Sequence, residues 1–430
     1  MAAGENLVDG FEEGLELGAR LRIVAVLLKE QARVGAHPTE NVKAYDLYLQ
    51  GRNTLRNAHG QDAYKQAEGL FEQAIEKDAN FALAYTGLSD SSLLMYKETK
   101  DSIWAQKATL AAQQAERLST NLPEVHMSLG TVYSTTGKNT EAVTELKKAL
   151  ELAPNSDEAY RNLGEAYSEN GQSDDAIAAY EKAVAANAYN VTNHVALGNA
   201  YLSLGDAAKA LPEFQKATEI ASDNPLGYEG IGSVYLRQGK WSEAIAQYQK
   251  ALTLAADSVT YSNVGTAYFF LKNYDEATKM YEKAVAMTPN NEELLGNLGD
   301  SYRWSGHSDQ ASSAYAKAIS LAFQELQVNP RSSGIMGDLG LLYAKKGDAA
   351  NATQYTNQAR AISPDDVQLM YSEAQVKTLI GKPEDALKSL RQALEKGYPA
   401  QEAWNDPELQ KLQSVPQFAQ LRNEFSKKSH

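Results

Sequence analysis

The stretch Leu163-Gly164-Glu165-Ala166-Tyr167 is one of seven copies of a single pattern, an aliphatic residue and a glycine followed three residues later by tyrosine. The other copies are Leu129-Gly130-x-x-Tyr133, Leu197-Gly198-x-x-Tyr201, Ile231-Gly232-x-x-Tyr235, Val264-Gly265-x-x-Tyr268, Leu298-Gly299-x-x-Tyr302 and Leu339-Gly340-x-x-Tyr343. Successive glycines lie 34, 34, 34, 33, 34 and 41 residues apart. Such a period is typical of repeat proteins, in which each unit buries its apolar face against the next. The stretch from Pro123 to Pro364 therefore decides the fold.

A second signature follows each glycine at a constant distance of twelve residues. It is an alanine in all seven copies: Ala142, Ala176, Ala210, Ala244, Ala277, Ala311 and Ala352. Four residues later stands a bulky side chain in six copies, Leu146, Tyr180, Phe214, Tyr248, Tyr281 and Tyr315, with Thr356 as the exception. Small residues let two helices approach, and bulky ones fill the remaining space. The two signatures therefore predict a pair of packed helices in each unit.

Both signatures, with Pro154, Pro289 and Pro364 closing three units, resemble the tetratricopeptide repeat (TPR) family. The resemblance implies an all-α, right-handed α-solenoid of about ten helix-turn-helix units with helical caps, built as one elongated array. We place the units at 43–81, 82–122, 123–156, 157–190, 191–224, 225–257, 258–291, 292–332, 333–366 and 367–398.

The two ends of the chain are expected to cap the array. Residues 1–42 carry Leu15, Leu21, Val24 and Leu28 at helical spacing, which predicts an amphipathic N-terminal helix, with a frayed leader as the alternative. Residues 399–430 follow the helix-breaking Gly397-Tyr398-Pro399 and are predicted to form a C-terminal helical cap.

Within the array, local signals set the helix ends and two units break the period. Gly137, Gly171, Gly205 and Gly239 are expected to end first helices in a left-handed conformation. Ser173 and Ser308 are placed to N-cap second helices. An insertion near residues 97–102 is expected to separate the helices of unit two. Unit eight is longer by seven residues within 319–331, and its apolar spacing predicts a lengthened second helix.

Composition limits the classes of partner. The chain has 430 residues, 43% of them hydrophobic, and a formal net charge of −14. This charge argues against a nucleic-acid partner. The longest apolar stretch near the N-terminus, residues 23–28, is too short for membrane insertion, and no secretory signal precedes it. Cysteine is absent, which excludes disulfides and thiolate ligands. We expect a soluble, cytoplasmic chain.

The sequence contains no complete catalytic motif. The pair Gly130 and Gly137-Lys138 has six residues between the glycines where a phosphate loop needs four. His126 and His194 occupy a packing position of the repeat and have no histidine or cysteine at metal-ligand spacing. We therefore predict a protein that is not an enzyme, with no catalytic residue, metal or cofactor.

The TPR resemblance implies that first helices line a concave groove, and it places candidate binding residues there. Amides recur at Asn162, Asn199, Asn263 and Asn297, and an amide can pair with a peptide backbone. Arg237 and Arg303 lie in the same groove, as does an aromatic group of Phe269, Phe270 and Trp304 that is typical of a binding hot spot. As alternatives, asparagine is also a common consensus residue at these positions of the repeat, and the aromatic group can pack against the superhelix interior.

These positions predict a scaffold or adaptor that binds a peptide or helical protein segment. Groove acids outnumber groove bases by eight to four, so the segment is expected to be basic or neutral rather than acidic. Self-association into an architectural assembly is one alternative. Another is an interaction arm of a bacterial signalling system, because Pro38-Thr39-Glu40-Asn41 and Asp406-Pro407-Glu408-Leu409 resemble flanks of the TPR region fused to serine/threonine kinase or winged-helix regulator modules.

Overall fold

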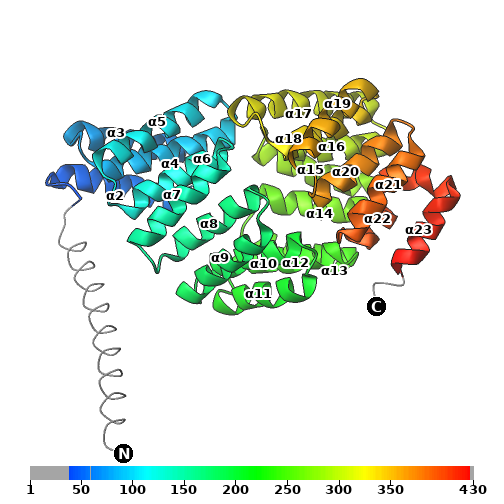
Figure 1. Ribbon diagram of the computed structural model, residues 1–430, viewed down its shortest axis with the longest axis horizontal. Helices are drawn as coiled ribbons and strands as arrows, with labels where there is room; N and C mark the ends of the chain where they lie inside the picture. The colour runs from blue at the N-terminus through cyan, green and yellow to red at the C-terminus, as the bar shows by residue number, and fades with distance from the viewer. Residues whose placement is uncertain (1–37, 59, 427–430) are drawn as a thin grey trace, which may run out of the picture.

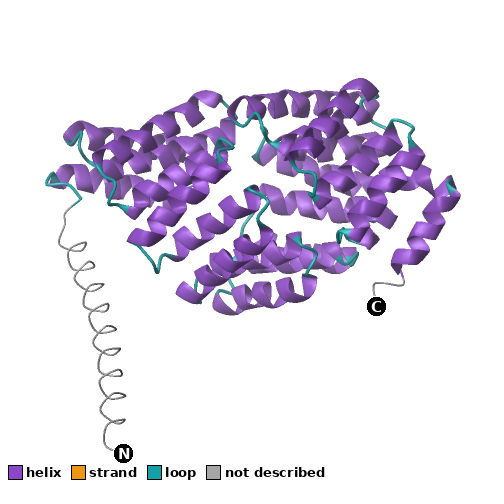
Figure 2. Cartoon of the chain, viewed as in Figure 1, coloured by secondary structure: helices purple, strands orange, loops and turns teal. Residues whose placement is uncertain are grey.

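A computed structural model describes residues 38–58 and 60–426, and every regular element in these residues is helical (Figure 2). Most of the predicted helix over residues 1–42 lies outside this range. Between Val42 and Glu395 the described chain forms ten consecutive helix pairs. Their bounds are α2 (Val42–Asn57) and α3 (Gln61–Lys77), α4 (Ala82–Thr99) and α5 (Ser102–Leu118), α6 (Pro123–Thr135) and α7 (Asn139–Leu152), α8 (Asp157–Glu169) and α9 (Ser173–Ala186), α10 (Val191–Ser203) and α11 (Ala207–Ile220), α12 (Pro225–Arg237) and α13 (Trp241–Leu254), α14 (Ser258–Phe270) and α15 (Tyr274–Met287), α16 (Glu292–Trp304) and α17 (Ser308–Val328), α18 (Ser333–Lys345) and α19 (Ala349–Ile362), and α20 (Val367–Leu379) and α21 (Pro383–Glu395).

The signature glycines work as close-approach sites inside each pair, as predicted. A Cβ atom added to Gly164 would lie 2.7 Å from Cε1 of Tyr180, and one added to Gly232 would lie 2.7 Å from Cε1 of Tyr248. Tyr248 is fully buried, and its hydroxyl lies 3.0 Å from Oγ of Ser233. The repeated glycine and aromatic residue are therefore two halves of one helix-to-helix contact.

The helix ends confirm one prediction and correct another. Gly171 and Gly239 adopt φ values of +72° and +71°, the left-handed region expected there. Ser173 and Ser308, however, are the first residues of α9 and α17, and neither helix has a side-chain cap. Side-chain capping falls mostly on the first helices instead. Seven of the first helices, α8, α10, α12, α14, α16, α18 and α20, begin after a residue whose side-chain oxygen accepts from a backbone N–H group of the helix. In the same order, these capping residues are Ser156, Asn190, Asn224, Asp257, Asn291, Ser332 and Asp366.

The helices from α6 to α16 have 13 or 14 residues, α2, α3 and α5 have 16, 17 and 17, and α4 and α17 are the two longest in the described residues. α17 has 21 residues, which confirms the lengthened second helix predicted for unit eight. α4 has 18 residues and runs to Thr99. The insertion in unit two therefore extends a helix, and only two residues separate α4 from α5. The prediction of a separating insertion was wrong because the extra residues continue the helical hydrogen bonding, up to Lys100 N–H donating to Tyr96 O at 2.8 Å.

Some contacts in the array join units that are not neighbours in the chain. The end of α17 returns to the first third of the chain, where it lies beside α5 (Figure 1). Asn329, which follows α17, approaches the turn at Gly137, and Gln401 approaches the turn at Gly239. The expectation of a simple elongated array is corrected here, because the superhelix turns far enough for its later units to meet its earlier ones.

The C-terminal residues form a cap, made of α22 (Ala400–Asn405), a 3-10 helix η1 (Pro407–Ser414) and α23 (Pro416–Ser426). Trp404, Leu409, Leu412 and Phe418 join one apolar cluster with Leu390 of α21. The last helix pair therefore buries its outer face against the cap rather than exposing it to water. No helix in residues 38–58 and 60–426 is long and apolar enough to span a membrane.

Candidate functional site

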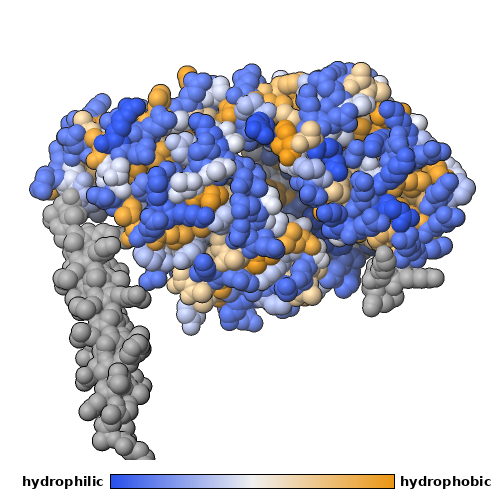
Figure 3. Space-filling view, in the orientation of Figure 1, coloured by the Kyte–Doolittle hydropathy of each residue, from blue (hydrophilic) through white to orange (hydrophobic). Residues whose placement is uncertain are grey.

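The first helices of the pairs line the inner side of the curved array. Most successive first helices contact one another, from α2 with α4 to α18 with α20, whereas successive second helices share far fewer contacts. In a curved stack, the side with the shorter spacing is the concave side. We call this surface, formed by α2, α4, α6, α8, α10, α12, α14, α16, α18 and α20, the concave wall. The face drawn in Figure 3 is hollowed between its upper and lower halves.

Polar side chains bridge neighbouring first helices along this wall. Arg52 of α2 pairs with Asp90 of α4 at 2.7 Å, and Arg161 of α8 donates to Oδ1 of Asn193 of α10 at 2.6 Å. Lys345 of α18 pairs with Asp300 of α16 at 2.6 Å. These bridges leave Arg52, Arg161 and Lys345 already partnered within the chain, so the wall offers fewer free cations than its sequence suggests.

The four predicted asparagines remain available to a partner. Asn162, Asn263 and Asn297 are half-buried, and Asn199 is exposed. None of the four side chains makes a hydrogen bond to another described residue. Each amide can therefore still offer two N–H donors and a carbonyl acceptor to an incoming backbone.

The predicted aromatic residues come together in a continuous row that is longer than the sequence indicated. Phe270 stacks on Trp241 with ring centroids 4.6 Å apart, and Phe269 contacts Tyr274 edge to face at 5.2 Å. Tyr274 in turn stacks on Trp304 at 5.6 Å. The sequence reasoning missed Trp241 and Tyr274, although both stand at the first position of a second helix, next to the end of the groove-lining helix.

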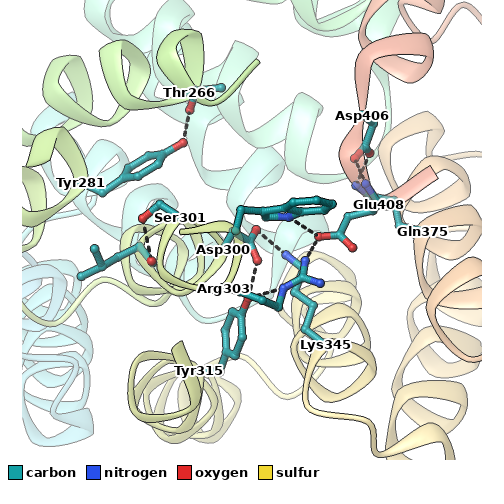
Figure 4. A network of polar contacts seen from close by, with 12 residues as sticks. Thr266, Tyr281, Asp300, Ser301, Arg303, Tyr315, Lys345, Gln375, Asp406 and Glu408 are labelled. Carbon is teal, nitrogen blue, oxygen red and sulfur yellow. Dashed lines mark hydrogen bonds and ion pairs between the residues drawn. The ribbon is translucent and has the colours of Figure 1, made fainter. Parts of the chain in front are cut away.

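The predicted arginines lie on the wall where the C-terminal cap covers it. Arg303 Nη2 forms an ion pair with Glu408, and Trp304 Nε1 lies 3.5 Å from the same carboxylate (Figure 4). Arg237 Nε lies 3.6 Å from Glu402. Both arginines and Trp304 thus have partners inside the chain, which gives them a role in seating the cap.

A third cap carboxylate, Asp406, is held by α20. It accepts hydrogen bonds from the Tyr371 hydroxyl and, at 2.7 Å, from Nε2 of Gln375. Asp406 is only 6% exposed, and this burial raises its pKa to about 6. The cap thus presents Glu402, Asp406 and Glu408 to the wall as a row of acids, each with its own partner.

Several acids elsewhere on the wall have no cation. Glu165 and Glu169 of α8, Glu293 of α16 and Asp338 of α18 form no ion pair within the described residues. Loss of hydration and the neighbouring Glu293 and Glu292 raise the pKa of Asp338 to about 7. The Asp338 side chain is exposed by surface area. Its raised pKa therefore comes from protein groups that face it across the concave side. Loss of hydration and Glu165 likewise raise the pKa of Glu169.

His126 and His194 make structural contacts, as their position in the repeat predicted. In His126, Nδ1 lies 2.7 Å from Oε2 of Glu145 and Nε2 lies 3.0 Å from the Thr120 carbonyl oxygen. His194 repeats this arrangement with Glu213 and the Ala188 carbonyl. Each ring thus ties a first helix to the second helix of its own pair and to the preceding loop.

Comparison with known families gives a consistent result along the array. Family models described as tetratricopeptide repeat match residues 185–257, 225–290 and 256–324, residues 157–190, and residues 297–367. A model described as TPR repeat matches residues 134–171. Together the matches run without a gap from 134 to 367, which is 234 of the 430 residues. No curated protein matches the chain.

Solved structures that match the chain include MamA, which is 25% identical over 38% of this chain and 97% of its own, with a TM-score of 0.32. A thermophilic TPR protein from Thermus thermophilus is 22% identical over 42% of this chain and 98% of its own, with a TM-score of 0.39. The APC/C hetero-tetramer Cut9-Hcn1 is 16% identical over 89% of this chain and 76% of its own, with a TM-score of 0.49.

Proposed function

Because the chain belongs to the tetratricopeptide repeat family, whose members are typically non-catalytic scaffolds for other proteins, we propose that it is a scaffold that holds a basic or neutral protein segment against its concave wall. The observation that carries this proposal is the charge balance of the wall. Arg52, Arg237 and Arg303 are paired within the chain, whereas Glu165, Glu293 and Asp338 have no cation among the described residues. A segment carrying lysine or arginine supplies the missing counter-charges, and an acidic segment meets repulsion.

Two further features support binding of an extended backbone. The amides of Asn162, Asn263 and Asn297 are spaced along α8, α14 and α16, and they make no hydrogen bonds within the described chain. The aromatic row from Trp241 to Trp304 provides rigid apolar surface that includes side chains of α14 and α16, the helices that carry Asn263 and Asn297. Amides fix a backbone in register, and aromatic side chains supply most of the affinity at typical interfaces.

The proposal is tested with three unstructured peptides of equal length, one rich in lysine, one rich in glutamate and one neutral. Their binding is measured by fluorescence anisotropy against the full chain and against a fourfold variant, Glu165→Gln, Glu169→Gln, Glu293→Gln and Asp338→Asn. We expect the lysine-rich peptide to bind the unmodified chain best. Exposed ion pairs contribute about 0.2–1 kcal/mol each, so the fourfold variant should lose about tenfold in affinity.

The matched control changes four exposed acids on second helices, Glu76→Gln, Glu151→Gln, Asp174→Asn and Glu243→Gln, and so alters net charge by the same amount. Its affinity should stay within about twofold of the unmodified chain, because remote exposed charges are screened by salt. Equal losses in the two variants would show that net charge, and not the wall, attracts the peptide.

The amide part of the proposal has its own test. The triple variant Asn162→Ala, Asn263→Ala and Asn297→Ala should weaken binding of the neutral peptide while the helical circular dichroism stays unchanged. Unchanged binding in this folded variant contradicts the groove mode.

A further inference from the structure

The two longest helices of the described chain, α4 and α17, are the places where the sequence departs from its period, and they meet each other in space. Lys100 caps the end of α4, and Glu325 lies in the last two turns of α17. Lys100 Nζ lies 2.9 Å from Oε1 of Glu325. The same ammonium lies 3.9 Å from Oε2 of Glu292, at the start of α16. In a nearby backbone contact, Asn290 Nδ2 donates to the carbonyl oxygen of Glu98 at 3.3 Å.

This junction is enclosed and short of positive charge. The side chains of Lys100, Glu292 and Glu325 are 14%, 10% and 17% exposed. Both carboxylate oxygens that face the ammonium are buried, and no other donor in the described residues reaches them. One cation therefore serves two carboxylates, and with both ionised the group carries an uncompensated negative charge where water has limited access.

The backbone at Lys100 is also unusual. Its φ is +58°, the left-handed region that side chains with a Cβ atom rarely adopt. This conformation stops α4 and directs the chain toward α5. Residue 100 thus both ends the lengthened helix and carries the ammonium to the junction.

We propose that these residues form a latch that holds the first superhelical turn closed, from α4 round to α17, and that the latch loosens when Glu292 and Glu325 are both ionised. With one proton on the carboxylate pair, the single ammonium balances the remaining charge. With no proton, the two carboxylates repel each other. The insertions in the second and eighth helix pairs exist, on this view, to close the ring of units between them.

The groups around Glu325 set the direction of the pH response. Glu292 on α16 faces it, Lys100 faces it from the end of α4, and the Tyr96 hydroxyl lies nearby on α4. Glu292 itself interacts with two further acids, Glu293 of α16 and Asp338 of α18. Burial and Glu292 raise the pKa of Glu325 to about 7, and Lys100 only partly opposes them. A raised carboxyl pKa stabilises the closed state at acidic pH, and that contribution is lost as pH rises through about 7.

The test follows the distance between α5 and α17. The chain contains no cysteine, so Ile103→Cys and Gln324→Cys, both at exposed positions, supply the sole labelling sites for a fluorescent donor and acceptor. We expect high energy transfer at pH 6 and a lower value at pH 8. In the added variant Lys100→Gly energy transfer should fall at both pH values. At pH 6 the singly protonated pair keeps one negative charge without a counter-ion, and at pH 8 two ionised carboxylates face each other without a cation. Glycine fits the left-handed backbone, so the change adds no strain.

Two further variants decide the outcome. Lys272 also adopts a left-handed φ, +61°, and has no ion pair in the described chain, so Lys272→Gly is the matched control and should leave energy transfer unchanged. Glu325→Gln leaves one carboxylate for one ammonium and should keep energy transfer high at both pH values. Equal behaviour of the two glycine variants, or a pH response that survives in Glu325→Gln, would overturn the latch.

Discussion

The regular helix pairs from α6 to α15 and the two long helices α4 and α17 follow different rules of contact. In the regular pairs, a glycine of the first helix meets an aromatic or leucine side chain of the second, as Gly198 meets Phe214. The end of α4 instead meets distant parts of the chain. Lys100 pairs with Glu325 of α17, and the Glu98 carbonyl oxygen accepts from Asn290, which precedes α16 and lies 192 positions away. Repetition of one contact builds the stack, and the breaks in repetition determine where the stack closes on itself.

The largest effect is expected from Phe214→Ala, which removes a buried side chain from the regular helix pairs. Phe214 is fully buried, and removing a buried aromatic side chain costs about 3–5 kcal/mol. Chemical denaturation should show a large drop in the transition midpoint. Tyr189→Ala is the control, because Tyr189 is 84% exposed, and it should change the midpoint little.

Hydrogen exchange on Phe214→Ala shows whether the regular pairs and the junction of α4 and α17 lose protection separately. Regular units contact mainly their neighbours, so protection should fall first in α10, α11 and α12. Protection at the junction of α4 and α17 should change less. An equal loss at that junction would mean that closure depends on the whole stack.

A smaller effect is expected from Gly232→Ala. The added Cβ atom would lie 2.7 Å from Tyr248 Cε1, and overpacking of this kind costs about 1–3 kcal/mol. Gly69→Ala is the matched control, because nothing lies within 4 Å of a Cβ atom at that position on α3. It should stabilise the chain by about 0.5–1 kcal/mol, as alanine is favoured over glycine inside a helix. Destabilisation by both changes would contradict the assignment of Gly232 as a close-approach site.

The smallest effect concerns Asp338, which connects the wall to the latch. Loss of hydration, followed by Glu293 and Glu292, raises the pKa of Asp338 to about 7, although its side chain is exposed by surface area. Glu292 also faces Lys100. Because a cation binds the ionised form, affinity for the lysine-rich peptide should rise a fewfold between pH 6 and pH 8. In Asp338→Asn this rise should flatten. A rise that persists in full assigns the pH response to other wall acids.

Much of the fold could be predicted because its signals are local and repeated. The left-handed glycines at Gly171 and Gly239 and the lengthened helix of unit eight were expected and are present. The capping role predicted for Ser173 was wrong, because a serine one residue inside the helix start is indistinguishable by sequence from one at the cap. The prediction that the insertion in unit two separates its helices was also wrong. By sequence alone, residues 97–99 can either continue a helix or form a loop.

The candidate site was predicted less completely. Four asparagines were predicted from their repeat positions to line the groove, and their side chains make no hydrogen bonds to other described residues. Phe269, Phe270 and Trp304 do lie in one aromatic row, but Trp241 and Tyr274 complete it from second helices. Glu402 and Glu408 of the cap neutralise Arg237 and Arg303. These pairs depend on how the cap docks, and the position of a residue within its repeat does not indicate the docking.

The repeat unit follows from the sequence alone, because the contact between a glycine and a bulky residue sixteen positions later lies within one pair of helices. Which carboxylates remain without a cation, and where the end of α4 meets α17, depend on the tertiary structure. Both follow from the accumulated rotation of successive units. Small angular steps add up along the stack, and their sum brings Lys100 to Glu325 and the cap to the wall.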